Sequence, residues 1–206
     1  MAPDPHAAYW DRQAATYDRT TRFLEPRLLA PARRWVAERV VGRTLEVAVG
    51  TGANLPYLAE HATDLTVTDV SAAMLDAAAA RAQVLGLPVR SVRADVTDLP
   101  LPDDSFDTVV CTFAMCCVPD ERVAMAAMAR VLKPGGMLLM ADHVASSTRT
   151  GRAVQRALDA VSSRESGEHY RRRPLLLVDG LGLELVESAT SRWRLVERLA
   201  ARKPTA

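Results

Sequence analysis

Short apolar runs alternate with longer amphipathic stretches through most of this chain. The runs cover residues 45–49, 65–69, 89–92, 106–113 and 137–141, and the second of them is a β-branched stretch that ends at an aspartate. The run at 106–113 is apolar almost throughout, which is typical of a strand that is covered on both faces. The stretches between the runs have the spacing of amphipathic helices. Five strands that alternate with helices predict a parallel, doubly wound α/β sheet.

Helices are predicted between these strands and at both ends of the chain. They are expected at residues 7–41, 55–60, 72–85, 150–163 and 174–180, and from Pro119 to the Pro-Gly-Gly turn at 134–136. The first is expected to break near Pro26 and Pro31, because proline disfavours the interior of a helix. Residues 164–174 are predicted to be a polar connection, and a terminal pair of strands is expected at 183–188 and 191–199.

A glycine-rich loop follows the first apolar run. Gly50 and Gly52 are expected to let the backbone approach a ligand closely, because glycine has no Cβ. Asn54 can cap the helix that follows, whose free N–H groups suit a carboxylate or a phosphate. The simpler interpretation is an ordinary turn between a strand and a helix.

Two carboxylates stand where the next two strands end. Asp69 lies at the end of the second strand, where it can accept hydrogen bonds from both hydroxyls of a ribose. A helix cap is the alternative for Asp69, but Ser71 is available for that role. Asp95 follows the third strand, where it can face an adenine amino group. Together with the glycine loop, these acids favour a nucleotide-like ligand.

Composition and charge exclude several classes of protein. The 206 residues have a formal net charge of +1, so no nucleic-acid partner is expected. The three cysteines, two of them adjacent, form neither a disulfide framework nor a zinc-ligand spacing, which fits a reducing cytoplasm and predicts no metal site. We expect a cytoplasmic protein, because the sequence has neither the apolar core of a signal peptide nor an apolar run that could span a bilayer.

The N-terminal region is richer in arginine than the rest of the chain. Residues 9–44 hold eight arginines and four acidic residues. Three interpretations stay open for its helices: a lid over the ligand, a cap packed on the core, or an amphipathic surface that contacts the inner face of an anionic membrane. The sequence gives no indication of the oligomeric state.

The motifs, taken in order, resemble those of class I S-adenosylmethionine-dependent methyltransferases. They are Glu46-x-Ala48-x-Gly50-x-Gly52, Asp69-Val70-Ser71-x-x-Met74-Leu75, Asp95 with Leu99-Pro100, Ser105-Phe106-Asp107, and Arg130-Val131-Leu132-Lys133-Pro134-Gly135-Gly136. One position departs from the family pattern, because Ala48 stands where the first glycine of the family would be. The loop is therefore expected to pack slightly differently.

The resemblance implies a fold and a donor site. The fold is a doubly wound, Rossmann-like sheet of seven strands whose last strand runs antiparallel, with an N-terminal helical lid at 1–42 and a core at 43–206. The donor is S-adenosylmethionine, and the product is S-adenosylhomocysteine. The implied donor-site residues are Tyr17, Glu46, Ala48, Gly50, Gly52, Asn54, Asp69, Val70, Met74, Asp95, Val96, Thr112 and Phe113.

The roles follow the family pattern. Glu46 and the two glycines line the methionine end, Asp69 takes the ribose, and Asp95 with Val96 takes the adenine. Thr112 and Phe113 border the sulfonium. Tyr17 and Asp18 resemble the Tyr-Asp pair of the lid, where an aromatic face favours the cation and excludes water.

Further motifs resemble one branch of these enzymes, which includes bacterial phosphatidylethanolamine N-methyltransferases and thiol S-methyltransferases. They are the stretches 111–120 and 142–144, Gln155 with Leu158-Asp159, and residues 167–172. Asp142 stands where this branch usually has glutamate. The implied acceptor is an amine, thiol or hydroxyl of a small molecule or lipid, with phosphatidylethanolamine the most specific candidate. A soluble natural product or thiol is the alternative.

Candidate catalytic residues are Tyr17, His143, His169 and Tyr170, of which each histidine is either a base or a structural residue. The arginines at 171–173 either bind a phosphate or form a solvated run, and the adjacent cysteines are expected to pack rather than react. A nicotinamide-dependent oxidoreductase would have glycine where Leu55 stands. A non-catalytic binding protein would be expected to lose Asp69 and Asp95.

Overall fold

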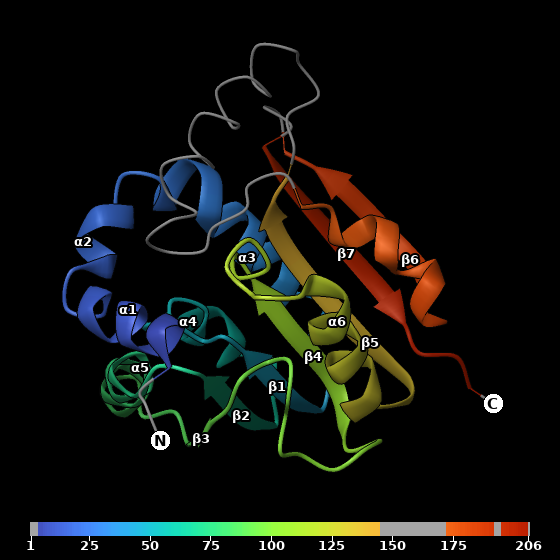
Figure 1. Cartoon of the computed structure of the whole chain (residues 1–206), viewed down its shortest axis with the longest axis horizontal. Helices are drawn as coiled ribbons and strands as arrows, with labels where there is room; N and C mark the ends of the chain where they lie inside the picture. The colour runs from blue at the N-terminus through green and yellow to red at the C-terminus, as the bar shows by residue number, and fades with distance from the viewer. Residues whose placement is uncertain (1–3, 145–171, 192–194, 206) are drawn as a thin grey trace.

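A single seven-stranded sheet forms the centre of the computed structural model, which describes residues 4–144, 172–191 and 195–205 (Figure 1). Its strands are β1 (Arg43–Val47), β2 (Asp64–Asp69), β3 (Val89–Arg93), β4 (Phe106–Thr112), β5 (Leu132–His143), β6 (Glu184–Thr190) and β7 (Val196–Arg202). They lie in the order β3-β2-β1-β4-β5-β7-β6. Strands β1 to β5 pair in parallel, and β7 runs antiparallel to both of its neighbours. This confirms the predicted doubly wound sheet with its antiparallel last strand.

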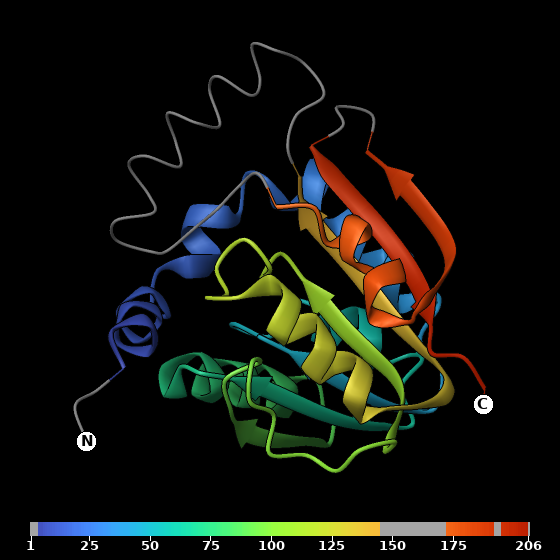
Figure 2. The same cartoon turned by 45° about the vertical axis from the view of Figure 1, so that its right-hand side comes forward.

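Helices cover both faces of the sheet. They are α1 (Pro5–Gln13), α2 (Tyr17–Thr21), the π-helical η1 (Glu25–Leu29), α3 (Ala30–Ala37), α4 (Leu55–Leu58), α5 (Ala72–Val84), α6 (Glu121–Val131) and the 3₁₀ turns η2 (Pro174–Leu177) and η3 (Asp179–Leu181). One face carries α3, α4 and α5, and the other carries α6 with η2 and η3 (Figures 1 and 2). Helices α1 and α2 stand to one side, where α1 packs against α5.

The central strands divide their side chains between two apolar layers. Val109 belongs to the layer under α6, and its neighbour Val110 belongs to the layer under α3 and α5. Leu138 and Leu139 on β5 are divided in the same way. Successive strand side chains point to opposite faces, so a strand between two helical layers must be apolar at every position. This explains why Val109, Val110 and Cys111 in the middle of β4 are all apolar.

Some element boundaries were predicted wrongly. The N-terminal helices are interrupted at 14–16 and 22–24, and η1 passes directly into α3 without a break at Pro31. Pro31 directly follows the π-helical turn of η1, which ends with a hydrogen bond from the Ala30 N–H to the Glu25 carbonyl. Strand β5 already begins at Leu132, and the last strand begins only at Val196. The helix predicted at 150–163 lies outside the described residues.

Candidate functional site

A cavity opens where the carboxyl ends of β1, β2 and β4 meet. The strand order reverses between β1 and β4, and such a switch point is where open α/β sheets bind ligands. The cavity encloses about 650 Å³, including its opening to solvent. It is lined by His6, Trp10, Tyr17, Ala48, Gly50, Asp69, Val70, Met74, Ala94, Asp95, Val96, Phe113, Ala114, Cys117, Val118 and Pro119. Nine of these residues were predicted as donor-site residues from the sequence.

The loop after β1 forms the floor of this cavity. Gly50 has φ +56°, and a Cβ built there would meet no atom within 4 Å. Its backbone is therefore open to a ligand, as predicted. Gly52 differs, because a Cβ there would lie 2.7 Å from Leu55 Cδ1 and 3.2 Å from Ala78 Cα. Gly52 is thus required for packing against α4 and α5, and it does not line the cavity.

Ala48 adopts a backbone conformation that L-residues rarely take. Its φ is 51°, in the left-handed region that glycine tolerates best. Alanine in place of the family's glycine therefore adds backbone strain at this position. The loop still reaches the cavity, which Ala48 lines.

Asp69 sits on the cavity wall with its carboxylate already oriented. Its Oδ2 accepts a hydrogen bond from the Gly50 N–H at 2.9 Å, and its Oδ1 accepts one from the Ser71 N–H at 2.9 Å. Burial raises the pKa of Asp69, and these N–H donors act in the opposite direction. A carboxylate has about four acceptor positions, so each oxygen can still accept a bond from one hydroxyl of a diol. Ser71 caps α5 by accepting from the Met74 N–H at 3.1 Å, as predicted.

Next to Asp69, the cavity combines a second carboxylate with apolar side chains. Oδ1 of Asp95 accepts from both the N–H and the hydroxyl of Thr97, at 2.8 and 2.7 Å. Val70, Met74 and Val96 lie on the same cavity wall. An apolar slot with a carboxylate at its edge fits a flat heterocycle that carries an amino group.

A buried polar network lies behind the cavity. Asn54 Nδ2 donates to Glu46 Oε1 at 2.6 Å and to Thr112 Oγ1 at 2.8 Å. The prediction that Asn54 caps α4 is therefore wrong, because its side chain is used between β1 and β4. Burial raises the pKa of Glu46 to about 7, while Asn54 and the charge of Arg33 act to lower it. Glu46 Oε2 is buried without a hydrogen-bond partner among the described residues.

Arg33 completes this network, although from the sequence it was expected only among the arginines that could face an anionic membrane. Its Nη1 donates to Asn54 Oδ1 at 2.8 Å and to Thr112 Oγ1 at 3.1 Å, and its Nε donates to Glu25 at 3.0 Å. Its guanidinium lies 5.0 Å from the centre of the Phe113 ring. The helical spacing of apolar residues could have indicated that Arg33 is buried. Arg33 occupies an apolar helical position in the series Leu29, Arg33, Val36 and Val40, and a charge there predicts a buried partner.

The N-terminal helices cover the cavity with aromatic side chains. His6 and Trp10 on α1 and Tyr17 on α2 line it, and the Trp10 ring meets the Tyr17 ring edge-on at 6.2 Å. Two aspartates fasten these helices to the core. Asp11 accepts from the Ser71 hydroxyl at 2.5 Å, and Asp18 accepts from the Thr51 hydroxyl at 2.6 Å and pairs with Arg81.

The loop after β4 forms the remaining wall. Phe113 begins it at φ 54°, and the His143 ring lies 5.1 Å from the Phe113 ring. His143 is not among the cavity-lining residues, and His169 and Tyr170 lie outside the described residues. Cys116 and Cys117 have sulfur atoms 3.4 Å apart, and Cys117 lines the cavity.

Two charged residues hold this loop from behind. Asp142 accepts from the Met115 N–H at 2.7 Å, and burial raises its pKa to about 7. Arg172 donates to the carbonyls of Met115 and Val118. Arg172 is thus a loop-positioning residue, and neither the solvated nor the phosphate-binding interpretation holds for it. Arg173 pairs with the Glu197 carboxylate at 3.2 Å.

The described residues contain neither of two other kinds of site. Among them, no group of three or more His, Cys, Asp or Glu side chains is placed to hold a metal ion. No helix in this part of the chain has both the length and the apolar character needed to cross a membrane.

Comparison with known proteins gives concordant similarities. The sequence pattern of a family described as "Methyltransferase domain" matches residues 45–140. A phosphatidylethanolamine N-methyltransferase of Cereibacter sphaeroides is 40% identical over 119 residues, which are 57% of this chain and 58% of that protein. A demethylmenaquinone methyltransferase of Renibacterium salmoninarum is 34% identical over 176 residues, which are 80% of this chain and 71% of that protein.

A solved structure shares the fold. The structure of a SAM-dependent methyltransferase from Aquifex aeolicus superposes with a TM-score of 0.68 at 18% identity, covering 94% of this chain and 98% of that one. The chain spans little more than half the length of the Cereibacter relative.

Proposed function

Because the chain belongs to the S-adenosylmethionine-dependent methyltransferases, we propose that it methylates a lipid acceptor, with the amine of phosphatidylethanolamine the leading candidate. S-adenosylmethionine is the methyl donor of this family. The observation that carries the choice of a lipid is the exposed apolar tip of the N-terminal helices, which is flanked by arginines.

The cavity fits the donor group by group. Asp69 offers acceptors to a ribose diol, the slot beside Asp95 suits adenine, and the open backbone at Gly50 leaves room for the chain that joins them. These three residues line the cavity and would hold the donor. Glu46, Gly52, Asn54 and Thr112 would act indirectly, because they pack or hydrogen-bond behind the wall.

When bound, the donor supplies a methyl group on a sulfonium, which is displaced in line by the acceptor. The protein therefore mainly positions the reactants and excludes water. Tyr17 and Trp10 close the cavity with aromatic faces that favour a cation. An attacking amine must be neutral, and it becomes an ammonium that then loses a proton. His143 packs on Phe113, which lines the cavity, and it is our candidate among the described residues for the acceptor of that proton.

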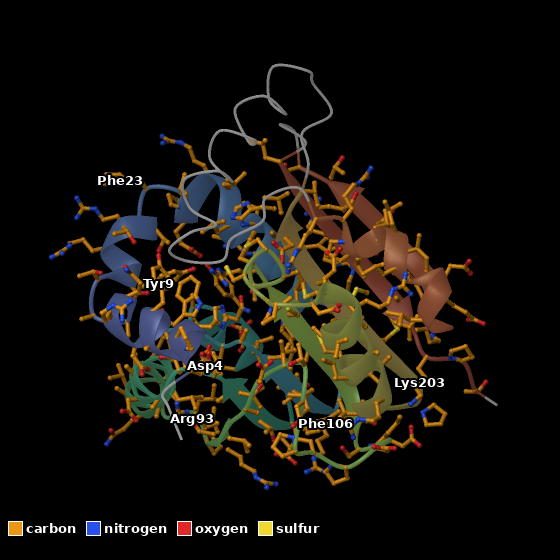
Figure 3. The ribbon with its side chains drawn as sticks, in the orientation of Figure 1. Asp4, Tyr9, Phe23, Arg93, Phe106 and Lys203 are labelled. Carbon is orange, nitrogen blue, oxygen red and sulfur yellow. The ribbon has the colours of Figure 1, made fainter. Side chains whose placement is uncertain are left out.

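The tip between α2 and η1 supports a lipid surface as the source of the acceptor. Phe23 is 70% exposed and Leu24 is 50% exposed, and Phe23 lies at the outer edge of the N-terminal helices (Figure 3). Arg19, Arg22 and Arg27 are exposed around them. The one acid in this stretch, Glu25, instead faces Arg33. Exposed aromatic and aliphatic side chains among arginines fit the interface of an anionic bilayer.

A second candidate acceptor is a membrane quinone. The Renibacterium relative, named as a demethylmenaquinone methyltransferase, aligns with more of this chain than the Cereibacter relative does. Both candidates dissolve in the bilayer, so the tip supports them equally.

Labelled S-adenosylmethionine tests the proposal with four acceptor sets: phosphatidylethanolamine vesicles, vesicles with demethylmenaquinone, and soluble panels of amines and of thiols and phenols. We expect label in one of the lipids, and loss of vesicle binding in Phe23→Ser. The control Val84→Ser removes a residue that is 88% exposed on α5 and should bind vesicles normally. Label only in a soluble acceptor, or vesicle binding unchanged in Phe23→Ser, would contradict the lipid proposal.

A further inference from the structure

A second cleft lies on the other side of Tyr17 from the cavity. It is formed by α2, η1, α3 and α4, and it encloses about 1160 Å³ including its opening to solvent. Tyr17 is the one residue that both lining sets contain. The cleft therefore adjoins the donor cavity and is separated from it by an aromatic side chain.

The charges in this cleft are unbalanced. Four arginines line it, at positions 22, 33, 34 and 81, with the two acids Asp18 and Glu25. Asp18 pairs with Arg81, and Glu25 pairs with Arg33. Within the described part of the chain, Arg22 and Arg34 have no carboxylate partner. Two positive charges without a carboxylate partner among the described residues thus line the cleft.

Arg33 connects the cleft to the chemistry of the donor cavity. It is 7% exposed, and its hydrogen bonds to described residues use Nε and Nη1. Nη2 is left available to a ligand in the cleft. The same guanidinium lies over Phe113, which lines the donor cavity. An anion bound at Arg33 would therefore lie next to the reacting groups.

We propose that this cleft binds an anionic oxygen group, a phosphate or a carboxylate, through Arg22, Arg34 and the Nη2 group of Arg33. Planar guanidinium groups match the geometry of both anions. The assignment of the anion to a reactant rests on the proposed function, and there are two sources. It is either the phosphate of the methyl acceptor or the carboxylate at the amino-acid end of the donor.

The first test uses inorganic phosphate as the probe, by calorimetry at constant ionic strength. The double variant Arg22→Gln with Arg34→Gln should bind phosphate about tenfold or more weakly, because two charged hydrogen-bond donors are lost. Both side chains are exposed, so the buried network stays intact. The matched control is Arg19→Gln with Arg27→Gln, which removes the same charge from the same segment outside the cleft.

The second test identifies the source by adding S-adenosylhomocysteine or 5′-methylthioadenosine, which lacks the amino-acid end. If the donor carboxylate is the source, only S-adenosylhomocysteine competes with phosphate. If the acceptor phosphate is the source, phosphate binds equally well beside both compounds. Either result supports the proposal that the cleft binds an anion.

Absence of phosphate binding, or equal weakening in the two double variants, would overturn the proposal. Phosphate titration needs no methyl transfer, so its failure is distinguishable from failure of the proposed lipid methylation.

Discussion

The buried carboxyl of Glu46 gives the sharpest prediction, since its pKa of about 7 in the folded protein lies well above its ordinary value of 4.5. Between these two pH values, folded Glu46 keeps a proton that the unfolded chain releases. Stability must then fall as the pH rises from about 4.5 to about 7, and it stays lower above pH 7. The difference between the two pKa values corresponds to about 3 kcal/mol, a large part of an ordinary free energy of unfolding.

Glu46→Gln removes the titration and keeps the oxygen that accepts from Asn54. The amide also places an N–H₂ group where Oε2 lacks a partner, and Arg33 loses a nearby negative charge. Absolute stability therefore combines gains and losses of about 1–3 kcal/mol each. The pH dependence of the free energy of unfolding separates the ionisation of Glu46 from these other effects.

Urea unfolding at pH 5, 6, 7 and 8 measures this dependence. We expect the free energy of unfolding of the wild type, relative to Glu46→Gln, to fall by about 3 kcal/mol between pH 5 and 8. Asp142, whose pKa is also raised to about 7, is present in both proteins and cancels in the difference. The control Glu38→Gln changes an exposed carboxyl and should follow the wild type. Parallel curves for wild type and Glu46→Gln would show that Arg33 keeps Glu46 ionised throughout, which would refute the reasoning.

Two further substitutions probe the cavity wall, each with a matched control. Ala48→Gly should stabilise the protein by about 0.5 kcal/mol, because relief of the positive φ slightly exceeds the added flexibility of the unfolded chain. Ala79→Gly, on the exposed side of α5, should instead destabilise it by about 1 kcal/mol, and urea unfolding of both variants checks the opposite signs. Asp69→Asn should weaken binding of S-adenosylhomocysteine by about 10- to 100-fold, because a hydrogen bond to a charged group contributes about 1.5–3 kcal/mol. Asp64→Asn, at the exposed start of the same strand, should bind normally by calorimetry, and equal affinities for the two variants would exclude Asp69 from the donor site.

The fold was predictable because its signals are local. A strand between two helical layers is apolar at successive positions, and Val109, Val110 and Cys111 in β4 show this directly. Ser71 caps α5 through a hydrogen bond from the N–H of Met74, which lies only three residues later in the chain. The cavity wall was predictable for a related reason: in a parallel sheet the residues after successive strands meet at one edge, so Gly50, Asp69 and Asp95 converge without long-range information.

The residues behind the wall required tertiary information. Asn54 has the local pattern of a helix cap, yet Glu46, Thr112 and Arg33 together offer its amide a fully buried set of partners. Leaving a buried charge unpaired costs far more free energy than leaving a helix uncapped. The Asn54 side chain therefore bonds to the buried network and does not cap α4. The arginine stretch shows the same limit. The sequence has eight arginines in this stretch, but only the folded chain separates Arg33, which joins the buried network, from the exposed Arg22 and Arg34, which line the cleft beside it. Burial thus divides these arginines into a structural part and a part that lines the proposed anion site.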